Sequence, residues 1–494
     1  MKKTGKIVTW IVTAGMLLSL VSCGQNSADH PGLQSLGADI LNGDDSMQAT
    51  GAGGAVASTG TQGTDAGMTK DGGTARHTDA SGGGLYLLAS QKQQGVCYTQ
   101  DGYYYLPGQP ESLSDGSYGS RLMYMDFATL QEVYLCSNAG CNHNSADCQA
   151  LCLYDEFPPF TALLFVYQDA LWILSREGED NSMYVDSTES VSLGSKMKEM
   201  ESVLYRMNLD GTDRRKVHTF EQNVAVEDLV LGDEEGIYVV EKEVAAKQEG
   251  THTYYTSMSR RLVRVNPDTG QETQVCSLDF GDGIQWNILG GYGNELLLSG
   301  TDYGRAYTQE EYYDDDTYKT LLENSVEIYA SLDLDSGQKT ERYRISNREE
   351  NCDRLVGHTL YVSSREGGGI KAIDLDTGAE RTVCVAEGNY YYIWDVVGDK
   401  LCCKDQSWDS TFYYIDMNTG TVSHSPLVNL SLGWSLEFKA VLDQDVLVVY
   451  DYDAVASGFG GYEIKRFQYG LISKEDLVAG NGNYRKIQMV GRGE

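Results

Sequence analysis

The sequence predicts an all-β fold, because short strands recur along most of the chain and one turn motif follows many of them. Seven apolar or aromatic segments recur between residues 102 and 449, with starts roughly 40 to 68 residues apart. Each is followed by a segment in which apolar and polar residues alternate, as in a half-buried strand. No stretch of comparable length shows a helical period.

Each repeat therefore contains two kinds of strand. The apolar kind has seven copies: Gly102–Leu106, Ala170–Leu174, Gly236–Val240, Glu295–Leu298, Thr359–Val362, Lys400–Cys403 and Val446–Val449. The alternating kind has six copies and a degenerate seventh: Leu122–Asp126, Leu204–Asn208, Leu262–Asn266, Ile328–Asp333, Ile370–Asp374, Phe412–Asp416 and Tyr462–Phe467.

A turn motif follows the alternating strand in most repeats. It starts with Asp or Asn, which caps the turn, and ends with Gly, which adopts a positive φ without steric cost, so it joins two antiparallel strands. Its copies are Asn266–Gly270, Asp333–Gly337, Asp374–Gly378 and Asp416–Gly420, with Asn208–Gly211 as a variant. Three copies contain the Asp-Thr/Ser-Gly tripeptide of aspartic proteases, but recurrence in successive repeats identifies a turn and not a catalytic pair.

All-β repeats of this length, rich in aromatic strands, predict a β-propeller with blades of four antiparallel strands. Seven repeats predict seven blades, with six or eight as alternatives. The alternatives arise because Leu85–Leu88 or Val96–Tyr98 could complete the last blade by pairing with a C-terminal strand. We expect the propeller to occupy residues 85–494.

The N-terminus has the features of an export signal. Three lysines lie within the first six residues, a mostly apolar run covers Ile7–Val21, and small Ser22 precedes Cys23. The run is too short to span a bilayer comfortably. The Leu20–Cys23 stretch resembles the lipobox of bacterial lipoproteins, which implies removal of residues 1–22 and diacylation of Cys23. The chain would then be lipid-anchored to the cell membrane on its extracytoplasmic face; an ordinary secretory peptide is the alternative.

Residues 23–84 are expected to form a disordered tether behind the lipidated cysteine. No Phe, Tyr or Trp occurs from Gly24 to Gly84, and glycine, threonine, alanine, serine and aspartate dominate the second half. A segment of this composition cannot bury enough apolar surface to fold.

The charge of the chain restricts its partners. Its formal net charge is −34, from 38 Lys and Arg against 72 Asp and Glu. Such a field repels nucleic-acid phosphates and anionic lipid heads. We therefore expect no nucleic-acid partner and a membrane attachment that depends on the lipid.

Cys136, Cys141, His143 and Cys148 form the densest group of metal-competent residues, with Cys152 close behind. One or two disulfides that staple the loop are the first interpretation. Three thiolates and an imidazole could instead form a tetrahedral structural zinc site, or a site for another thiophilic metal. Unpaired thiols are the third alternative.

Two further groups of residues are candidates for binding. An acidic insertion in the fourth repeat contains Asp314, Asp315 and Asp316, which could hold calcium but lack the spacing of an EF-hand loop, so a solvated loop is favoured. Four tryptophans near strand starts or loops could stack on sugars or peptides, or fill the space between blades. They are Trp286, Trp394, Trp408 and Trp434.

Over about residues 85–490, the strand repeats and Asp-x-x-x-Gly turns resemble those of YWTD and pyrroloquinoline-type propellers. With the lipobox, they resemble especially the propeller lipoproteins of unknown role in anaerobic Gram-positive gut bacteria. The resemblance implies the fold and is nearly uninformative about activity.

The sequence favours a non-catalytic surface module over an enzyme. There is no Gly-x-Ser-x-Gly elbow, no glycine-rich phosphate loop and no sialidase box. We expect a binding or scaffolding module for an extracellular protein, peptide or glycan, with no catalytic residue assigned. The alternative is an exported glycan hydrolase or lyase that uses carboxylates at the mouth of the propeller channel.

Overall fold

The computed structural model describes residues 84–490 with gaps at 108–110, 114–117, 144–146, 154–155, 158–161, 177–184, 187–200, 222–223, 250–251, 285, 306–310, 312–314, 347–350, 365–367, 386–389, 406–409 and 457–461. The predicted leader, Cys23 and the tether up to residue 83 lie outside the described residues. Within the described part, no helix is long and apolar enough to cross a bilayer.

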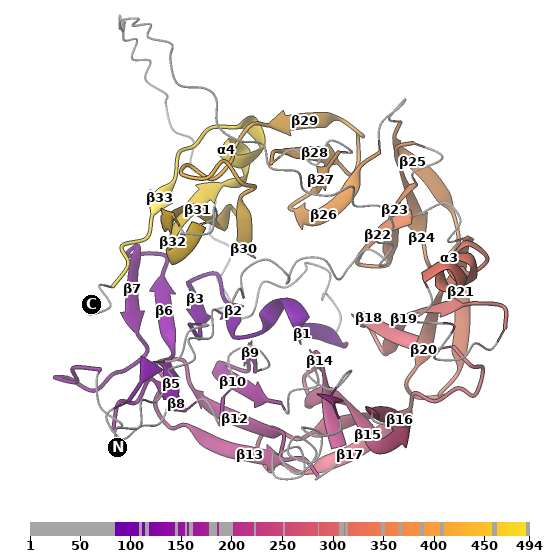
Figure 1. The fold of residues 1–494 in the computed structure, drawn as a ribbon, viewed down its shortest axis with the longest axis horizontal. Helices are drawn as coiled ribbons and strands as arrows, with labels where there is room; N and C mark the ends of the chain where they lie inside the picture. Colours follow the sequence, from indigo (N-terminus) through magenta and orange to yellow (C-terminus); the bar gives the residue numbers. More distant parts are fainter. Residues whose placement is uncertain are drawn as a thin grey trace, which may run out of the picture. The chain divides into compact units, whose positions relative to one another are not determined.

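Seven blades of four antiparallel strands follow one another around a common axis as a β-propeller, and the sheet of the third blade has two further strands (Figure 1). The predicted fold class and blade number are confirmed. The first strand of each blade lies nearest the axis and the fourth at the rim. The two strand kinds predicted in each repeat are the two middle strands of each blade, because those strands are covered on both faces and carry the strongest apolar signal.

The strands of blades 1 to 4 follow in chain order. Blade 1 has β2 (Val96–Tyr98), β3 (Gly102–Tyr105), β6 (Met123–Asp126) and β7 (Gln131–Tyr134). Blade 2 has β9 (Leu163–Tyr167), β10 (Ala170–Ser175), β12 (Val203–Asn208) and β13 (Arg215–Thr219). Blade 3 has β14 (Val224–Gly232), β15 (Ile237–Glu249), β16 (His252–Val265) and β17 (Glu272–Ser277). Blade 4 has β18 (Trp286–Tyr292), β19 (Glu295–Asp302), β20 (Val326–Asp333) and β21 (Lys339–Ser346).

Blades 5 to 7 continue the same order. Blade 5 has β22 (Asn351–Val356), β23 (Thr359–Ser364), β24 (Ile370–Asp374) and β25 (Glu380–Cys384). Blade 6 has β26 (Tyr392–Val397), β27 (Lys400–Lys404), β28 (Phe412–Asp416) and β29 (Val422–Ser425). Blade 7 has β30 (Glu437–Val441), β31 (Asp445–Ala456), β32 (Tyr462–Ser473) and β33 (Arg485–Lys486).

The apolar core lies between neighbouring blades. Strand β10 is buried along its whole length. Trp172 of blade 2 belongs to a buried cluster with Val239 of blade 3, and Tyr103 of blade 1 shares another with Val449 of blade 7. Each blade therefore completes its core only against its neighbours, so the blades depend on one another for stability.

The ring closes differently from the expectation. Strand β2 is the inner strand of blade 1, and β1 (Tyr86–Ser90) pairs with β14 of blade 3, so neither segment completes the last blade. Blade 7 is already complete from its own four strands. Closure instead uses a parallel bridge between Gln131 on β7 and Gln488 near the C-terminus.

Several elements lie outside the four-stranded pattern. Strands β4 (Glu111–Ser112), β5 (Tyr118–Arg121) and β8 (Leu151–Leu153) form a small sheet of their own, and β11 (Val185–Asp186) pairs with β16. Helix α3 (Asp315–Glu323) lies between β19 and β20, and α4 (Lys474–Ala479) follows β32. The helices were not predicted, because each is short and surrounded by strand repeats.

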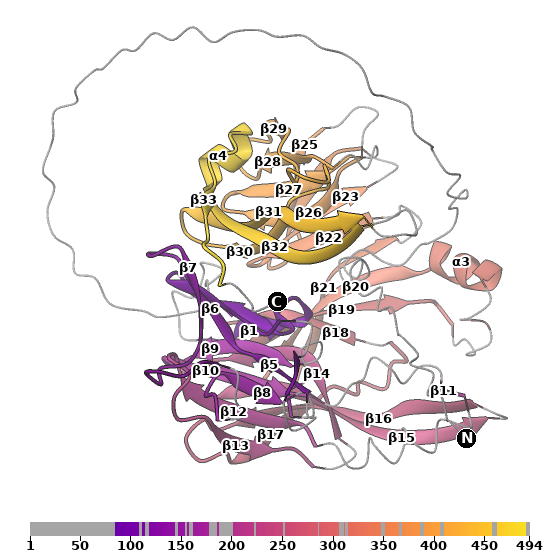
Figure 2. The ribbon, with the colours of Figure 1, turned by 60° about the vertical axis from the view of Figure 1, so that its left-hand side comes forward.

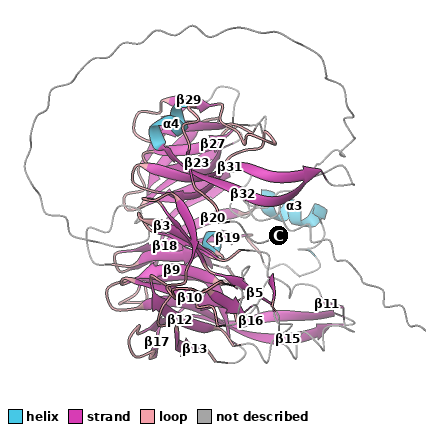
Figure 3. Ribbon diagram, turned by 90° about the vertical axis from the view of Figure 1, so that its left-hand side faces the viewer, coloured by secondary structure: helices cyan, strands magenta, loops and turns pink. Residues whose placement is uncertain are grey.

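Two blades extend well beyond the others on one face of the ring. The β15–β16 and β31–β32 hairpins project on the same side, with α3 on that side too (Figures 2 and 3). Strands β31 and β32 have 12 residues each, whereas the matching β27 and β28 of blade 6 have five. Most of the strand extensions and the helix α3, which go beyond the four short strands of a typical blade, therefore lie on this face.

Candidate metal centre

The sequence-predicted Cys and His residues converge on one point. One ligand atom from each of Cys136, Cys141, His143 and Cys148 lies within 4.8 Å of the other three. Cys148 Sγ and His143 Nδ1 are 3.5 Å apart. Among the described residues this is the one group of three or more Cys, His, Asp or Glu side chains close enough to share a metal ion.

Backbone geometry brings the four side chains together in the loop between β7 and β8. Gly140 and His143 have φ angles of 86° and 55°, in the left-handed region that turns the chain sharply. The backbone N–H of His143 donates to Cys141 Sγ at 3.4 Å. The His143 ring stacks on Tyr134, with centroids 4.4 Å apart and planes at 26°, which fixes the direction of the imidazole.

The electrostatics of the loop favour the protonation state that binds a metal at two of the four residues, a neutral imidazole at His143 and a thiolate at Cys136. Desolvation lowers the pKa of His143, and the charge of Arg121 lowers it further, so the ring is kept neutral. Desolvation opposes ionisation of Cys136, but backbone donors from Asn138 and Gln149 outweigh it and lower the pKa of that thiol.

Cys148 behaves in the opposite way. Burial raises the pKa of its thiol to about 11. A thiol in this environment ionises readily only when a nearby cation compensates the desolvation.

Cys152 does not belong to the group. It is fully buried, and its sulfur accepts a hydrogen bond at 3.2 Å from Arg214, whose guanidinium also donates to the carbonyl of Gln149. Cys136, Cys141, Cys148 and Cys152 form no disulfide in the structure.

The group is supported by a small satellite sheet. Strands β4, β5 and β8 contain two, four and three residues. Buried Leu113, Cys148, Ala150 and Leu151 form the apolar cluster beneath them, with Cys136 and Cys141 packed against it. A sheet this short cannot stabilise itself through burial alone.

The structure places the predicted binding tryptophans in or against cores where it describes them. Trp286 is buried and donates to Asp282, so its ring is not available to a ligand. Trp394 and Trp434 are half-buried and pack against apolar clusters of their blades. Trp408 lies outside the described residues.

The last two residues of the acidic insertion, Asp315 and Asp316, form the start of helix α3. Asp314 lies outside the described residues; Asp315 begins the helix, and Asp316 in its first turn is exposed. Acidic residues in a first turn complement the helix dipole. No group of ligands suited to calcium is found there among the described residues.

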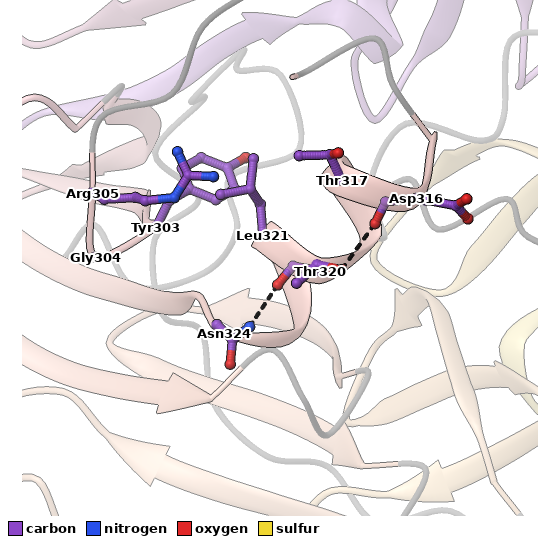
Figure 4. Close-up of a pocket in the computed structure, with 8 residues that line it drawn as sticks. All are labelled: Tyr303, Gly304, Arg305, Asp316, Thr317, Thr320, Leu321 and Asn324. Atoms are coloured by element: carbon purple, nitrogen blue, oxygen red, sulfur yellow. Dashed lines mark hydrogen bonds between the residues drawn. The ribbon is translucent and has the colours of Figure 1, made fainter. Parts of the chain in front are cut away.

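An open cavity of about 540 Å³ lies between α3 and residues 303–305 after β19 (Figure 4). Its lining has two charged side chains, Arg305 and Asp316. Arg305 already donates to both carboxylate oxygens of Glu311, at 3.2 and 2.9 Å. The cavity therefore offers few polar groups that are free to recognise a ligand.

A feature that the sequence did not predict lies inside the ring. The segment from Leu85 to Gly95, which we call the inner strap, runs along the inner edges of several blades (Figure 1). Its ends donate to Gly293 O of blade 4 and to Ala162 O at the start of blade 2, both at 2.7 Å. Lys92 of the strap lies 3.7 Å from Asp395 on β26 of blade 6. Its sequence has no motif, so no pattern could have revealed this path.

Comparisons with known proteins indicate only distant similarity. No family model and no curated protein sequence matches the chain. Among solved structures it is similar to puromycin hydrolase, with 11% identity over 83% of this chain and 54% of that one and a TM-score of 0.44. The acylaminoacyl peptidase of Pyrococcus horikoshii is 12% identical over 69% of this chain and 47% of its own, with a TM-score of 0.36. This chain thus spans about half the length of either enzyme, and the similarities carry no information about activity.

Proposed function

We propose that this chain is a lipid-anchored binding module on the extracytoplasmic face of the cell membrane. Its propeller would bind an extracellular protein, peptide or glycan without catalysing a reaction. The anchor is supported by the lysine-rich leader, the apolar run and Cys23. The binding role is supported by the surface of blade 7.

The observation that carries the binding proposal is the long β31–β32 hairpin. It projects from the face that also bears β15–β16 and α3 (Figure 3). Val455, Tyr462 and Phe467 on this hairpin are 48%, 58% and 38% exposed. By the strand register Tyr462 and Phe467 lie on the same face of the hairpin. Exposed aromatic side chains on one face of a projecting element are typical of interaction surfaces, where aromatic anchors supply most of the binding energy.

The inner strap supports binding over catalysis at the channel. A glycan hydrolase or lyase would need carboxylates free to act at the mouth of the ring. Asp395, a carboxylate at the inner edge of blade 6, is instead close to the ammonium of Lys92. The strap itself occupies the inner edge of blade 3, where an extended ligand would otherwise pair.

The binding proposal is tested by site-specific crosslinking. A photoreactive amino acid at Tyr462 should yield covalent adducts on cells of the producing species, because this side chain is exposed on the hairpin. The matched control is Val422, which is 42% exposed on the outer strand of blade 6. Adducts of equal yield at both positions, or at neither, would contradict a binding surface on blade 7.

The catalytic alternative is tested separately. Purified protein lacking the leader is incubated with a panel of polysaccharides, and new reducing ends or unsaturated products are measured. We expect neither. Turnover that survives Tyr462→Ser would support the hydrolase or lyase instead.

The anchor has its own test. Cys23→Ala should move the protein from the membrane fraction to the soluble fraction, because no residue would remain for acylation. Retention of the variant in the membrane fraction would contradict a lipid anchor at Cys23.

A further inference from the structure

We propose that Cys136, Cys141, His143 and Cys148 bind one zinc ion in a closed tetrahedral site. The site would fix the connection between blades 1 and 2 and the small sheet β4–β5–β8. This inference does not depend on the proposed binding function, since the residues lie in the loop between β7 and β8 and not on the β31–β32 hairpin.

The spacing of the ligand atoms fits zinc. Zinc–sulfur bonds of about 2.3 Å and zinc–nitrogen bonds of about 2.0–2.1 Å place ligand atoms about 3.4 to 3.8 Å apart at tetrahedral angles. The 3.5 Å between Cys148 Sγ and His143 Nδ1 falls in that range. All four atoms lie within 4.8 Å of one another, so small adjustments bring the set to bonding distance.

A metal explains features that a disulfide does not. A disulfide uses two sulfurs and would leave the third thiol and the imidazole without a reason to converge. Here the His143 ring is held against Tyr134, with its Nδ1 directed at a sulfur of the group. The backbone N–H of His143 donates to Cys141 Sγ, the kind of second contact that orients a thiolate ligand.

The ligand types select the metal and its role. Three thiolates and one imidazole form a soft donor set suited to zinc in tetrahedral geometry. Four protein ligands leave no position for water or substrate, so the site would be structural. The satellite sheet has only a small apolar cluster beneath it, and a metal cross-link supplies the stability that its size does not.

The test begins with the unaltered chain. The anchor-free protein, residues 24–494, is purified without reductant or added chelator, and its metal content and native mass are measured. We expect one zinc per chain, lost on treatment with a strong chelator. Cobalt added to the metal-free protein should give the visible absorption of tetrahedral cobalt–thiolate coordination.

Substitutions then assign the ligands. Cys148→Ser should abolish stoichiometric zinc binding, whereas the matched control Cys152→Ser should retain it, because Cys152 contacts Arg214 and not the cluster. Should Cys148→Ser fail to fold, His143→Cys provides a second variant, since it keeps four ligands and should still bind one cobalt ion with a shifted spectrum.

Three outcomes would overturn the proposal. The first is a mass lower by about two daltons per cystine with no bound metal, because each disulfide removes two hydrogens. The second is full alkylation of these thiols in native, metal-free protein whose unfolding temperature does not change on adding zinc. The third is zinc binding that Cys152→Ser removes and Cys148→Ser does not.

Discussion

Glu132 is a buried carboxylate that joins the two ends of the ring. Its side chain has no exposed surface. It accepts hydrogen bonds from the Tyr105 hydroxyl and, at 2.7 Å, from the backbone N–H of Val490, and Arg466 lies 3.6 Å away. A buried carboxylate with these partners is costly to remove, because its removal takes away the acceptor of two hydrogen bonds and the partner of a nearby guanidinium.

Glu132→Ala should therefore destabilise the protein by about 2–3 kcal/mol, the cost of removing the shared acceptor of buried hydrogen bonds. Glu132→Gln should cost less, because the amide oxygen can accept from Val490 while its NH₂ donates to Tyr105. The measurement is the urea midpoint of unfolding. Val133→Ala, on the exposed side of the same strand, is the control and should change stability by about 0.5 kcal/mol or less. Equal midpoints for Glu132→Ala and the control would refute this role.

Sequence patterns identify single residues only where the chemistry is local. The spacing of Cys136, Cys141, His143 and Cys148 within one loop was enough to single them out. Cys402 and Cys403 are neighbours on β27, so their side chains point to opposite faces of the blade, and both are buried because β27 is covered on both faces. Trp286 shows the same limit, since burial between blades is set by partners distant in sequence.

The repeated turn is the element that the sequence predicted best. In the Asp374 copy, Asp374 Oδ1 accepts from the backbone N–H of Asp376 at 3.1 Å and of Thr377 at 2.8 Å, and from the Thr377 hydroxyl at 2.8 Å. Gly378 closes the turn with φ of 69°. Asn266 makes the same contacts in its own turn, so the acceptor oxygen matters more than the charge.

These turns should contribute to the acid sensitivity of the protein. Side-chain and backbone hydrogen bonds from Ser336 lower the pKa of Asp333, and those from Thr377 lower the pKa of Asp374. A carboxylate with a lowered folded-state pKa stabilises the fold above its unfolded pKa, which is about 3.9. That contribution is lost as the pH falls from about 4 toward the folded-state pKa.

The double variant Asp333→Asn, Asp374→Asn should keep the turns, as Asn266 does, and remove their titration. We expect its acid-unfolding midpoint, followed by circular dichroism between about pH 5 and pH 2, to move to lower pH. Asp335→Asn with Asp443→Asn removes the same charge without changing a capping side chain and should move the midpoint less. A shift of equal size in both variants would attribute the effect to net charge alone.

For the whole molecule, strand repeats predicted the number of blades but not how the ring closes. Each blade can be recognised from its two buried middle strands, because each of these strands is a short continuous segment of the sequence. Closure depends on contacts between residues some 350 positions apart, such as Glu132 and Val490, that share no motif with the repeats. The path of the inner strap was missed for the same reason, since it is defined by its pairing with β14 and not by its composition.

The C-terminal segment should therefore control the stability of all seven blades. Gln488 donates to Leu130 O at 2.8 Å and accepts from the N–H of Glu132 at 2.9 Å, and Met489 and Val490 pack against the cluster shared by blades 1 and 7. Truncation after Ile487 removes these contacts and leaves blade 1 with an open outer edge. Because neighbouring blades share their cores, we expect one cooperative unfolding transition at a lower temperature, measured by calorimetry.

Truncation after Val490 is the control, because it retains every contact described for the closure and should leave the unfolding temperature unchanged. If truncation after Ile487 instead left the main transition in place and produced a separate early transition for blade 7, the blades would be energetically independent. That result would contradict the proposed role of the closure. Because the apolar cores lie between blades, loss of the interface between blades 1 and 7 should lower the stability of both of these blades.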